Sequence, residues 1–189
     1  MSRRGNLFVI SGPSGAGKGT LVARILPCVE DAWLSVSATT RKPREGEVDG
    51  VHYFFLSDAE FDDLIEHDGF LEWAQVFTNR YGTPRAKIEE HMAQGGQVIL
   101  EIDVQGAFQV KEKMPQAHLV FIEPPSVEIL EQRLRGRGTE TEDVINIRLE
   151  TALVELSQKM KYDVRIVNDD LEKATSELVA YIEAQASKN

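Results

Sequence analysis

The sequence predicts an α/β fold: a parallel sheet flanked by helices, with a small mixed α/β insertion and a helical lid. Short continuous apolar runs alternate with helical stretches, which is typical of strands buried on both faces and joined by crossover helices. A turn rich in Gly, Pro and Ser follows the first apolar run and precedes the first helical stretch. The 189 residues suffice for one domain with a sizeable core.

Four apolar runs are predicted as strands of the parallel sheet: residues 7–10, 98–102, 119–122 and 164–167. Residues 34–37 are a candidate for one further strand. Helices are predicted to begin near Leu21 and to close the chain over residues 170–186. Because strands and helices alternate along the chain, we expect the strands to be parallel.

Two segments break the alternation. Residues 38–87 hold frequent Gly and Pro, short aromatic runs and a helix-like stretch at 57–67, which indicates a mixed insertion with strands of its own. Residues 126–160 are helical and rich in charge, and glycines interrupt them at 135–138, which predicts a hinge for a mobile flap. Beyond the hinge, apolar residues at spacings of three and four define one face of a helix: Ile145, Leu149, Ala152, Leu156 and Met160.

Charge and cysteine content exclude several functions. The chain has 21 Lys+Arg against 31 Asp+Glu, a net charge of −10, whereas nucleic-acid binding needs a basic surface, so we expect no nucleic-acid partner. Cys28 is the only cysteine, which excludes an internal disulfide and a cysteine metal cluster. The sequence has no apolar run of membrane-spanning length. We therefore expect a cytoplasmic protein with no membrane partner.

The turn after the first strand matches the G-x-x-x-x-G-K pattern of a phosphate-binding loop, or P-loop. Its glycines let backbone N–H groups turn inward around a phosphate, the following helix adds the positive end of its dipole, and Lys18 reaches the β- and γ-phosphates of a nucleotide. An ordinary glycine-rich turn with a surface lysine is the alternative, but the flanking strand and helix argue against it. The expected ATP-binding residues of the loop are Gly12, Pro13, Ser14, Gly15, Ala16, Gly17, Lys18, Gly19 and Thr20.

One position departs from the P-loop pattern. Gly19 stands where the general motif has the Ser or Thr that holds Mg²⁺. Either Thr20 takes over this role, or water and the oxygens of the nucleotide hold the metal, which Mg²⁺ readily accepts. The sequence leaves both possibilities open.

A second anion site is predicted between Thr39 and Phe55. Arg41 and Arg44 lie three residues apart in this loop, and two guanidinium forks can grip one phosphate. Hydroxyl donors can come from Tyr53 and Tyr81. The alternative is a solvated charged loop in which neighbouring carboxylates neutralise the arginines: Glu45, Glu47 and Asp49.

Together these motifs resemble those of the guanylate kinase family, P-loop enzymes that phosphorylate GMP. The resemblance covers nearly the whole chain, and the stretch 39–55 is its most specific part. The other segments that carry it are 12–20, 70–74, 81–82, 101–106, 121–126, 133–142 and 167–170.

The resemblance implies roles for individual residues. It assigns the GMP phosphate to Arg41, Arg44, Tyr53 and Tyr81, and the guanine to Ser37, Glu72, Thr83 and Asp103. It adds Arg137 and Asn168 to the ATP-binding residues. The catalytic residues that it implies are Lys18, Arg41, Arg44, Arg133, Arg137 and Arg148.

The resemblance also implies an activity and a division of the chain. The activity is transfer of the γ-phosphoryl group of ATP to GMP or dGMP, giving ADP and GDP in purine nucleotide metabolism, with Mg²⁺ accompanying ATP. The parts are a P-loop core (residues 1–36, 88–125 and 161–189), a GMP-binding insertion (37–87) and a lid (126–160).

The chemistry of guanine agrees with these assignments. Guanine offers two adjacent donors, N1–H and N2–H₂, which a carboxylate such as Glu72 accepts, and an acceptor, O6, to which the Ser37 hydroxyl can donate. Each residue also has a structural alternative. Glu72 could lie on the surface of a half-buried strand, Asp103 could cap the helix that follows it, and Ser37 could be a strand-end hydroxyl.

Two other functions compete with this interpretation. Another nucleoside-monophosphate kinase would share the P-loop but not the tyrosine-containing acceptor stretch. A catalytically silent binding module of the same fold would lack phosphate-binding residues, whereas Lys18, Arg41, Arg44 and Arg137 are all present. The second pKa of a phosphate monoester is about 6, so the acceptor is already ionised at pH 7 and the reaction needs no general base.

Overall fold

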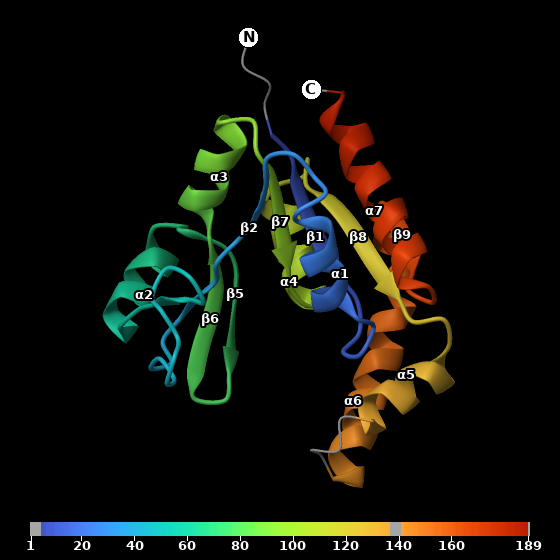
Figure 1. The fold of residues 1–189 in the computed structure, drawn as a ribbon. Helices are drawn as coiled ribbons and strands as arrows, with labels where there is room; N and C mark the ends of the chain where they lie inside the picture. The colour runs from blue at the N-terminus through green and yellow to red at the C-terminus, as the bar shows by residue number, and fades with distance from the viewer. Residues whose placement is uncertain (1–4, 137–140, 189) are drawn as a thin grey trace.

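The computed structural model describes residues 5–136 and 141–188. Its centre is a parallel five-stranded sheet in the order β2-β7-β1-β8-β9 (Figure 1). The strands are β1 (Leu7–Ser11), β2 (Ala32–Leu34), β7 (Gln97–Glu101), β8 (His118–Glu123) and β9 (Val164–Val167). The α/β prediction and the four main strands are confirmed.

The candidate strand at 34–37 is wrong in its position. β2 begins at Ala32 and ends at Leu34, and it pairs with β7 alone, as the edge of the sheet. After Leu34 the chain leaves the sheet, so Ser37 stands directly before the first strand of a second sheet. The prediction was therefore in the right region of the chain, but the residues that pair with β7 are Ala32–Leu34.

Helices cover both faces of the five-stranded sheet, and its central strand β1 is buried at every position. Phe8 and Ile10 point to the face covered by α1 (Lys18–Ile25) and α7 (Leu171–Ala186). Leu7 and Val9 point to the opposite face, covered by α3 (Arg85–Ala93) and α4 (Val104–Lys113). The core is thus two apolar layers, one on each side of the sheet, as a strand buried on both faces requires.

The predicted insertion forms a four-stranded sheet in the order β4-β3-β6-β5. Its strands are β3 (Ala38–Thr39), β4 (Phe54–Phe55), β5 (Phe70–Val76) and β6 (Asn79–Pro84), and α2 (Asp58–Glu66) packs on it. The core of this unit is small and aromatic, with Phe61 and Phe70 fully buried. Ser57 and Glu60 cap the start of α2 reciprocally, which explains why the helix begins there.

The segment predicted as a lid contains α5 (Val127–Arg135) and α6 (Glu142–Ser157), which pack through Leu130, Leu134 and Ala152. The spacing predicted Met160 on the apolar face of α6, and this prediction is wrong. The helix ends at Ser157, and Met160 lies in a following 3₁₀ turn with 73% of its surface exposed. The tighter turn carries the chain toward β9 and so breaks the helical spacing.

The inserted four-stranded sheet and the α5–α6 segment lie on either side of the carboxyl end of β1. In Figure 1 the four-stranded sheet with α2 extends to one side of the central sheet, and α5 and α6 extend to the other. The loop from β1 to α1 lies between them. In the described ranges, no helix is long and apolar enough to cross a membrane.

Candidate active site

The predicted P-loop joins β1 to α1 with backbone conformations that only glycine adopts easily. Gly15 and Gly17 have φ values of 89° and 88°. A side chain at Gly17 would also collide with Asn168, since a Cβ there would lie 2.4 Å from the Asn168 amide nitrogen. The loop therefore brings the N-terminus of α1, whose first amides point out of the helix, to the carboxyl end of the sheet.

Asn168 fastens this loop from the end of β9. Its side chain is buried and donates from Nδ2 to the Ala16 carbonyl at 2.8 Å, while its own N–H donates to the Glu123 carbonyl. Asn168, which the resemblance assigned to ATP, is thus in direct contact with the P-loop. The residue supports the backbone of the P-loop directly.

The amine of Lys18 lies over the loop that precedes it. Its Nζ donates to the carbonyl oxygens of Gly12 and Pro13, at 2.6 and 3.0 Å. These contacts place the positive charge at the mouth of the loop. A phosphate held by the loop amides would meet this charge.

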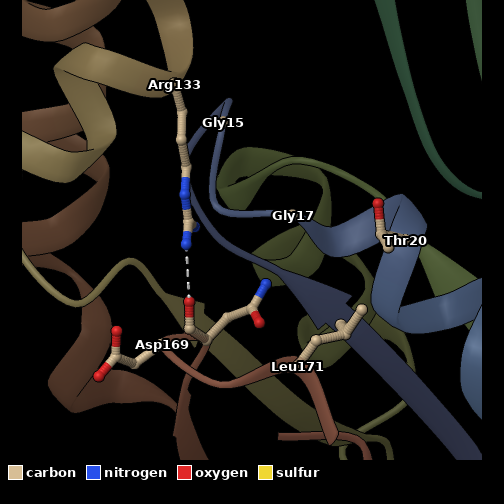
Figure 2. A pocket seen from close by; sticks show the side chains of 7 residues that line it. Gly15, Gly17, Thr20, Arg133, Asp169 and Leu171 are labelled. Carbon is tan, nitrogen blue, oxygen red and sulfur yellow. Dashed lines mark hydrogen bonds between the residues drawn. The ribbon is translucent and has the colours of Figure 1, made fainter.

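A cavity of about 350 Å³ opens beside the P-loop, lined by Gly15, Gly17, Thr20, Arg133, Asn168, Asp169 and Leu171. Arg133 reaches into it from α5 and donates to the Asn168 carbonyl at 3.0 Å (Figure 2). The structure therefore places Arg133 beside the P-loop. Arg148 lies half-buried on α6, the helix that packs against α5, and Arg137 lies outside the described residues.

Glu101 is a carboxylate beside the P-loop that we did not expect from the sequence. Its two carboxyl oxygens lie 3.5 and 3.6 Å from the point that a Cβ on Gly19 would occupy, so the missing side chain leaves room next to them. Desolvation raises the pKa of Glu101, and the charge of Lys18 acts in the opposite direction. Its place at the end of β7, the strand that pairs with β1, is a signal that could have identified it.

Hydrogen bonds between its own residues hold the arginine loop, which joins β3 to β4. Both terminal nitrogens of Arg41 donate to the carboxylate of Glu47, at 2.8 and 2.9 Å, and the N–H of Arg44 donates to the same carboxylate at 2.7 Å. One of the three nearby carboxylates therefore does pair with an arginine, as the alternative interpretation held. These bonds hold the pKa of Glu47 down at about 2.

Two tyrosines complete the surroundings of Arg41. Its guanidinium carbon lies 5.5 Å from the centre of the Tyr53 ring, and the rings of Tyr53 and Tyr81 meet edge to face at 6.0 Å. The pKa of Arg41 is raised chiefly by Glu47 and further by Tyr81, while desolvation opposes both. The side chain of Arg44 lies on an exposed part of the loop.

A second cavity, of about 160 Å³, lies between the inserted sheet and the end of β7. Glu72 of β5 lines it, and its Oε1 accepts a hydrogen bond from the buried hydroxyl of Thr83 at 2.6 Å. Burial is the main cause that raises the pKa of Glu72, and the charge of Asp103 adds to it. The cavity is lined by Ser37, Tyr53, Glu72, Ala74, Val76, Tyr81, Gly82, Ile102 and Asp103.

The structure brings together the four residues that the resemblance assigned to guanine. Ser37, Glu72 and Asp103 line the cavity directly, and Thr83 orients Glu72. Asp103 also caps α4, because its Oδ1 accepts from the N–H of Gly106 at 2.7 Å. Its capping role and its place at the cavity therefore coexist.

A glycine-rich loop at the end of a parallel strand, followed by a helix N-terminus and a lysine, defines a P-loop protein. The arginine loop and the polar cavity beside it mark the subclass that acts on a second nucleotide, the nucleoside-monophosphate kinases. Comparison with known proteins identifies the family. The family model described as guanylate kinase matches residues 4–185.

Individual proteins similar to this chain are guanylate kinases as well. The chain is 49% identical to a guanylate kinase of Prochlorococcus marinus over 182 residues, which is 96% of this chain and 98% of that protein. It is 52% identical to one of Syntrophomonas wolfei, covering 100% and 96% of the two chains. The crystal structure of guanylate kinase from Anaplasma phagocytophilum superposes with a TM-score of 0.74 at 34% identity, over 98% of this chain and 88% of that one. The chain belongs to the guanylate kinase family, whose activity is phosphoryl transfer from ATP to GMP.

Proposed function

We propose that the two cavities are the donor and acceptor sites of this reaction. ATP takes the cavity at the P-loop (residues 12–20), with its phosphates on the backbone N–H groups of the loop and on Lys18. GMP takes the cavity of the inserted sheet, with its phosphate on Arg41, Arg44, Tyr53 and Tyr81 and its base on Ser37, Glu72, Thr83 and Asp103. One observation carries the choice of guanine: a half-buried carboxylate, Glu72, held by a hydrogen bond and facing a cavity.

Glu72 suits guanine because it offers acceptors where guanine has donors. With Thr83 bonded to Oε1, the carboxylate still has lone pairs for N1–H and N2–H₂ of the base. Adenine has no 2-amino group, and its N1 is an acceptor, so a carboxylate there repels it. The assigned residues contact base and phosphate only, and we therefore expect both GMP and dGMP as acceptors.

The chain works as three parts in this proposal. The P-loop core (1–36, 88–125 and 161–189) holds ATP, the insertion (37–87) holds GMP, and the lid (126–160) closes over both. Closure brings Arg133, Arg148 and Arg137 to the phosphates and excludes water, which would otherwise hydrolyse ATP. Arg133 already lines the donor cavity.

Positioning and charge neutralisation perform the chemistry. The acceptor phosphate ionises by itself, so no residue has to remove a proton. Lys18 and the lid arginines stabilise negative charge on the transferring group. Arg41 and Arg44 reduce the repulsion between two anions that must meet in line.

Mg²⁺ with ATP fits the residues beside the P-loop. Thr20 supplies a hydroxyl that lines the donor cavity, and Glu101 supplies a carboxylate next to the open space at Gly19. Such oxygen donors suit Mg²⁺, which binds through one or two protein groups together with phosphate oxygens and water. Within the described residues there is no cluster of three or more His, Cys, Asp or Glu that could hold a metal. When bound, the ion would neutralise the charge of the donor phosphates.

The test is Glu72→Gln, measured by ADP release with GMP, dGMP, AMP and UMP as acceptors. The substitution keeps the shape but turns one acceptor oxygen into a donor that faces the donors of guanine. We expect kcat/KM for GMP to fall roughly 10- to several-hundred-fold, since an unpaired buried donor costs about 1–3 kcal/mol. The KM for ATP should stay the same, and AMP should gain little.

Glu112→Gln is the matched control, because Glu112 is an exposed carboxylate on α4 and the change in charge is identical. It should leave all four acceptor profiles unchanged. An unaltered GMP profile in Glu72→Gln would remove Glu72 from the base site and contradict the assignment.

A further inference from the structure

The arginine loop contains an acid that the assigned roles do not use. Glu47 accepts three hydrogen bonds within the loop, two from the guanidinium of Arg41 and one from the backbone of Arg44. Both partners are residues assigned to the GMP phosphate. The pair is also shielded, since the side chains of Arg41 and Glu47 are only 14% and 18% exposed.

A turn built on Gly46 brings Glu47 back to these partners. The N–H of Glu47 donates to the carbonyl of Arg44 at 3.0 Å, and Gly46 between them has a φ of 84°, in the left-handed region. A Cβ on Gly46 would touch nothing within 4 Å, so the conformation of the backbone alone requires glycine there.

Glu47 and Lys42 take the hydrogen-bond donors on one side of the Arg41 guanidinium. A guanidinium has five N–H donors. Among the described residues, Glu47 takes one from Nη1 and one from Nη2, and the Lys42 carbonyl takes the other from Nη1 at 2.8 Å. The two donors that neither Glu47 nor Lys42 takes, on Nε and Nη2, form the side edge of the fork, which has the geometry to bind two oxygens of one phosphate. Tyr81, which is assigned to the same phosphate, also interacts with this guanidinium. The ring of Tyr53 holds the plane of the guanidinium from one face.

We propose that Glu47 is a positioning residue of the acceptor-phosphate site: it holds Arg41 by one edge so that the other edge meets the phosphate of GMP. The inference rests on the proposed function, because it takes Arg41 as a phosphate ligand. The proposal predicts the direction in which GMP affinity changes when Glu47 loses its charge. Removing a negative charge near a phosphate site should by electrostatics alone tighten phosphate binding, whereas loss of positioning weakens it.

The experiment is calorimetric titration of the full chain with GMP and with guanosine, which fills the base site but has no phosphate. Glu47→Gln should weaken GMP binding about tenfold and change guanosine binding less than twofold. In the steady state the KM for GMP should rise by the same factor, with the KM for ATP unchanged. Glu45→Gln, an exposed neighbour with the same change in charge, should bind both ligands like the unmodified protein.

Two further variants separate the possible failures. Gly46→Ala disturbs the turn without altering any charge and should weaken GMP, not guanosine. The double variant Arg41→Gln, Glu47→Gln should bind GMP no more weakly than Arg41→Gln alone, because Glu47 acts through Arg41. If Arg41→Gln weakens GMP but Glu47→Gln leaves it unchanged or tighter, or if guanosine weakens equally, the inference on Glu47 is wrong and the phosphate site stands. If Arg41→Gln itself has no effect, the phosphate assignment fails, and the inference with it.

Discussion

The two proposed nucleotide sites, at the P-loop and at the inserted sheet, are built by different means. At the P-loop, the groups proposed to bind phosphate are backbone amides and one lysine, arranged by glycines and a helix N-terminus within a single short segment. In the inserted sheet they are side chains from separate strands and loops, held by one another: Arg41 by Glu47, and Glu72 by Thr83. Backbone amides recognise phosphate in any nucleotide, whereas a network of side chains can select a base. We therefore expect changes at the P-loop to affect the rate and changes in the inserted sheet to affect the choice of acceptor.

The largest effect should come from the P-loop. Lys18→Ala should lower kcat about 10²- to 10³-fold at saturating ATP and GMP, because a charge next to the transferring group is lost. A coupled assay of ADP release measures it. Lys87→Ala, which removes a lysine with 54% side-chain exposure on α3, is the control and should keep full turnover. Near-full turnover in Lys18→Ala would refute the donor assignment.

Arg41→Gln should act on the acceptor instead. We expect the KM for GMP to rise roughly 10- to 150-fold, since a hydrogen bond between charged groups contributes about 1.5–3 kcal/mol. Arg80→Gln is matched to it, because Arg80 belongs to the same insertion, on β6, and its side chain has a similar exposure of 16%, but it pairs with Asp58 and Asp62 of α2. Equal KM increases in the two variants would mean that the loss is structural.

Acid should weaken recognition of the base through Glu72. Only the ionised carboxylate accepts both guanine donors, and burial raises the pKa of Glu72 above its ordinary value of 4.5. Guanosine affinity should therefore fall about tenfold per pH unit below this raised pKa, at a higher pH than for an ordinary carboxyl group. Guanosine is used because it lacks the phosphate, which titrates itself. A Glu72→Gln protein should lose this pH dependence.

Ionisation of Glu72 should have opposite effects on the two properties: it strengthens guanosine binding but lowers the stability of the folded chain. A raised pKa means that the folded chain binds the proton of Glu72 more tightly than the unfolded chain, so this group costs stability once the pH rises through the folded pKa. Glu72→Gln keeps an acceptor for Thr83 without the charge. Its Tm at neutral pH should consequently be higher than that of the unmodified protein, and a lower Tm would contradict the desolvation of Glu72.

The smallest effect should be that of Thr20→Val. If the hydroxyl of Thr20 takes part in holding Mg²⁺, its loss should raise the Mg²⁺ concentration needed for half-maximal rate about 2- to 10-fold. GMP binding should not change. If Thr20→Val has the same Mg²⁺ dependence as the unmodified protein, Thr20 does not hold the metal, and water, the nucleotide and Glu101 remain as its ligands.

The sequence predicted the fold and the P-loop well because both depend on neighbouring residues. Strands buried on both faces appear as apolar runs, and the loop conformation is set by glycines at fixed spacing. Met160 was placed wrongly because helical spacing does not show where a helix ends. The strand at 34–37 was misplaced because the apolar pattern does not specify which backbone groups pair.

The acceptor site was harder to predict because its residues meet only in the folded chain. Glu72 and Thr83 lie on paired strands, and Asp103 comes from the core, so no local pattern joins them. The position of Glu101 beside the P-loop depends on which strand pairs with β1. The contact between Glu47 and Arg41 was open from the sequence, because a carboxylate six residues away can equally well be solvated.

The central claim is that the P-loop and the inserted sheet are separate sites for separate nucleotides. Titration of GMP into the Lys18→Ala protein tests it most directly, because that variant should lose turnover while its inserted sheet stays intact. We predict a GMP affinity within about twofold of that of the unmodified protein. A loss of GMP affinity comparable to the loss of kcat would show that Lys18 holds the acceptor, and would contradict the division into two sites.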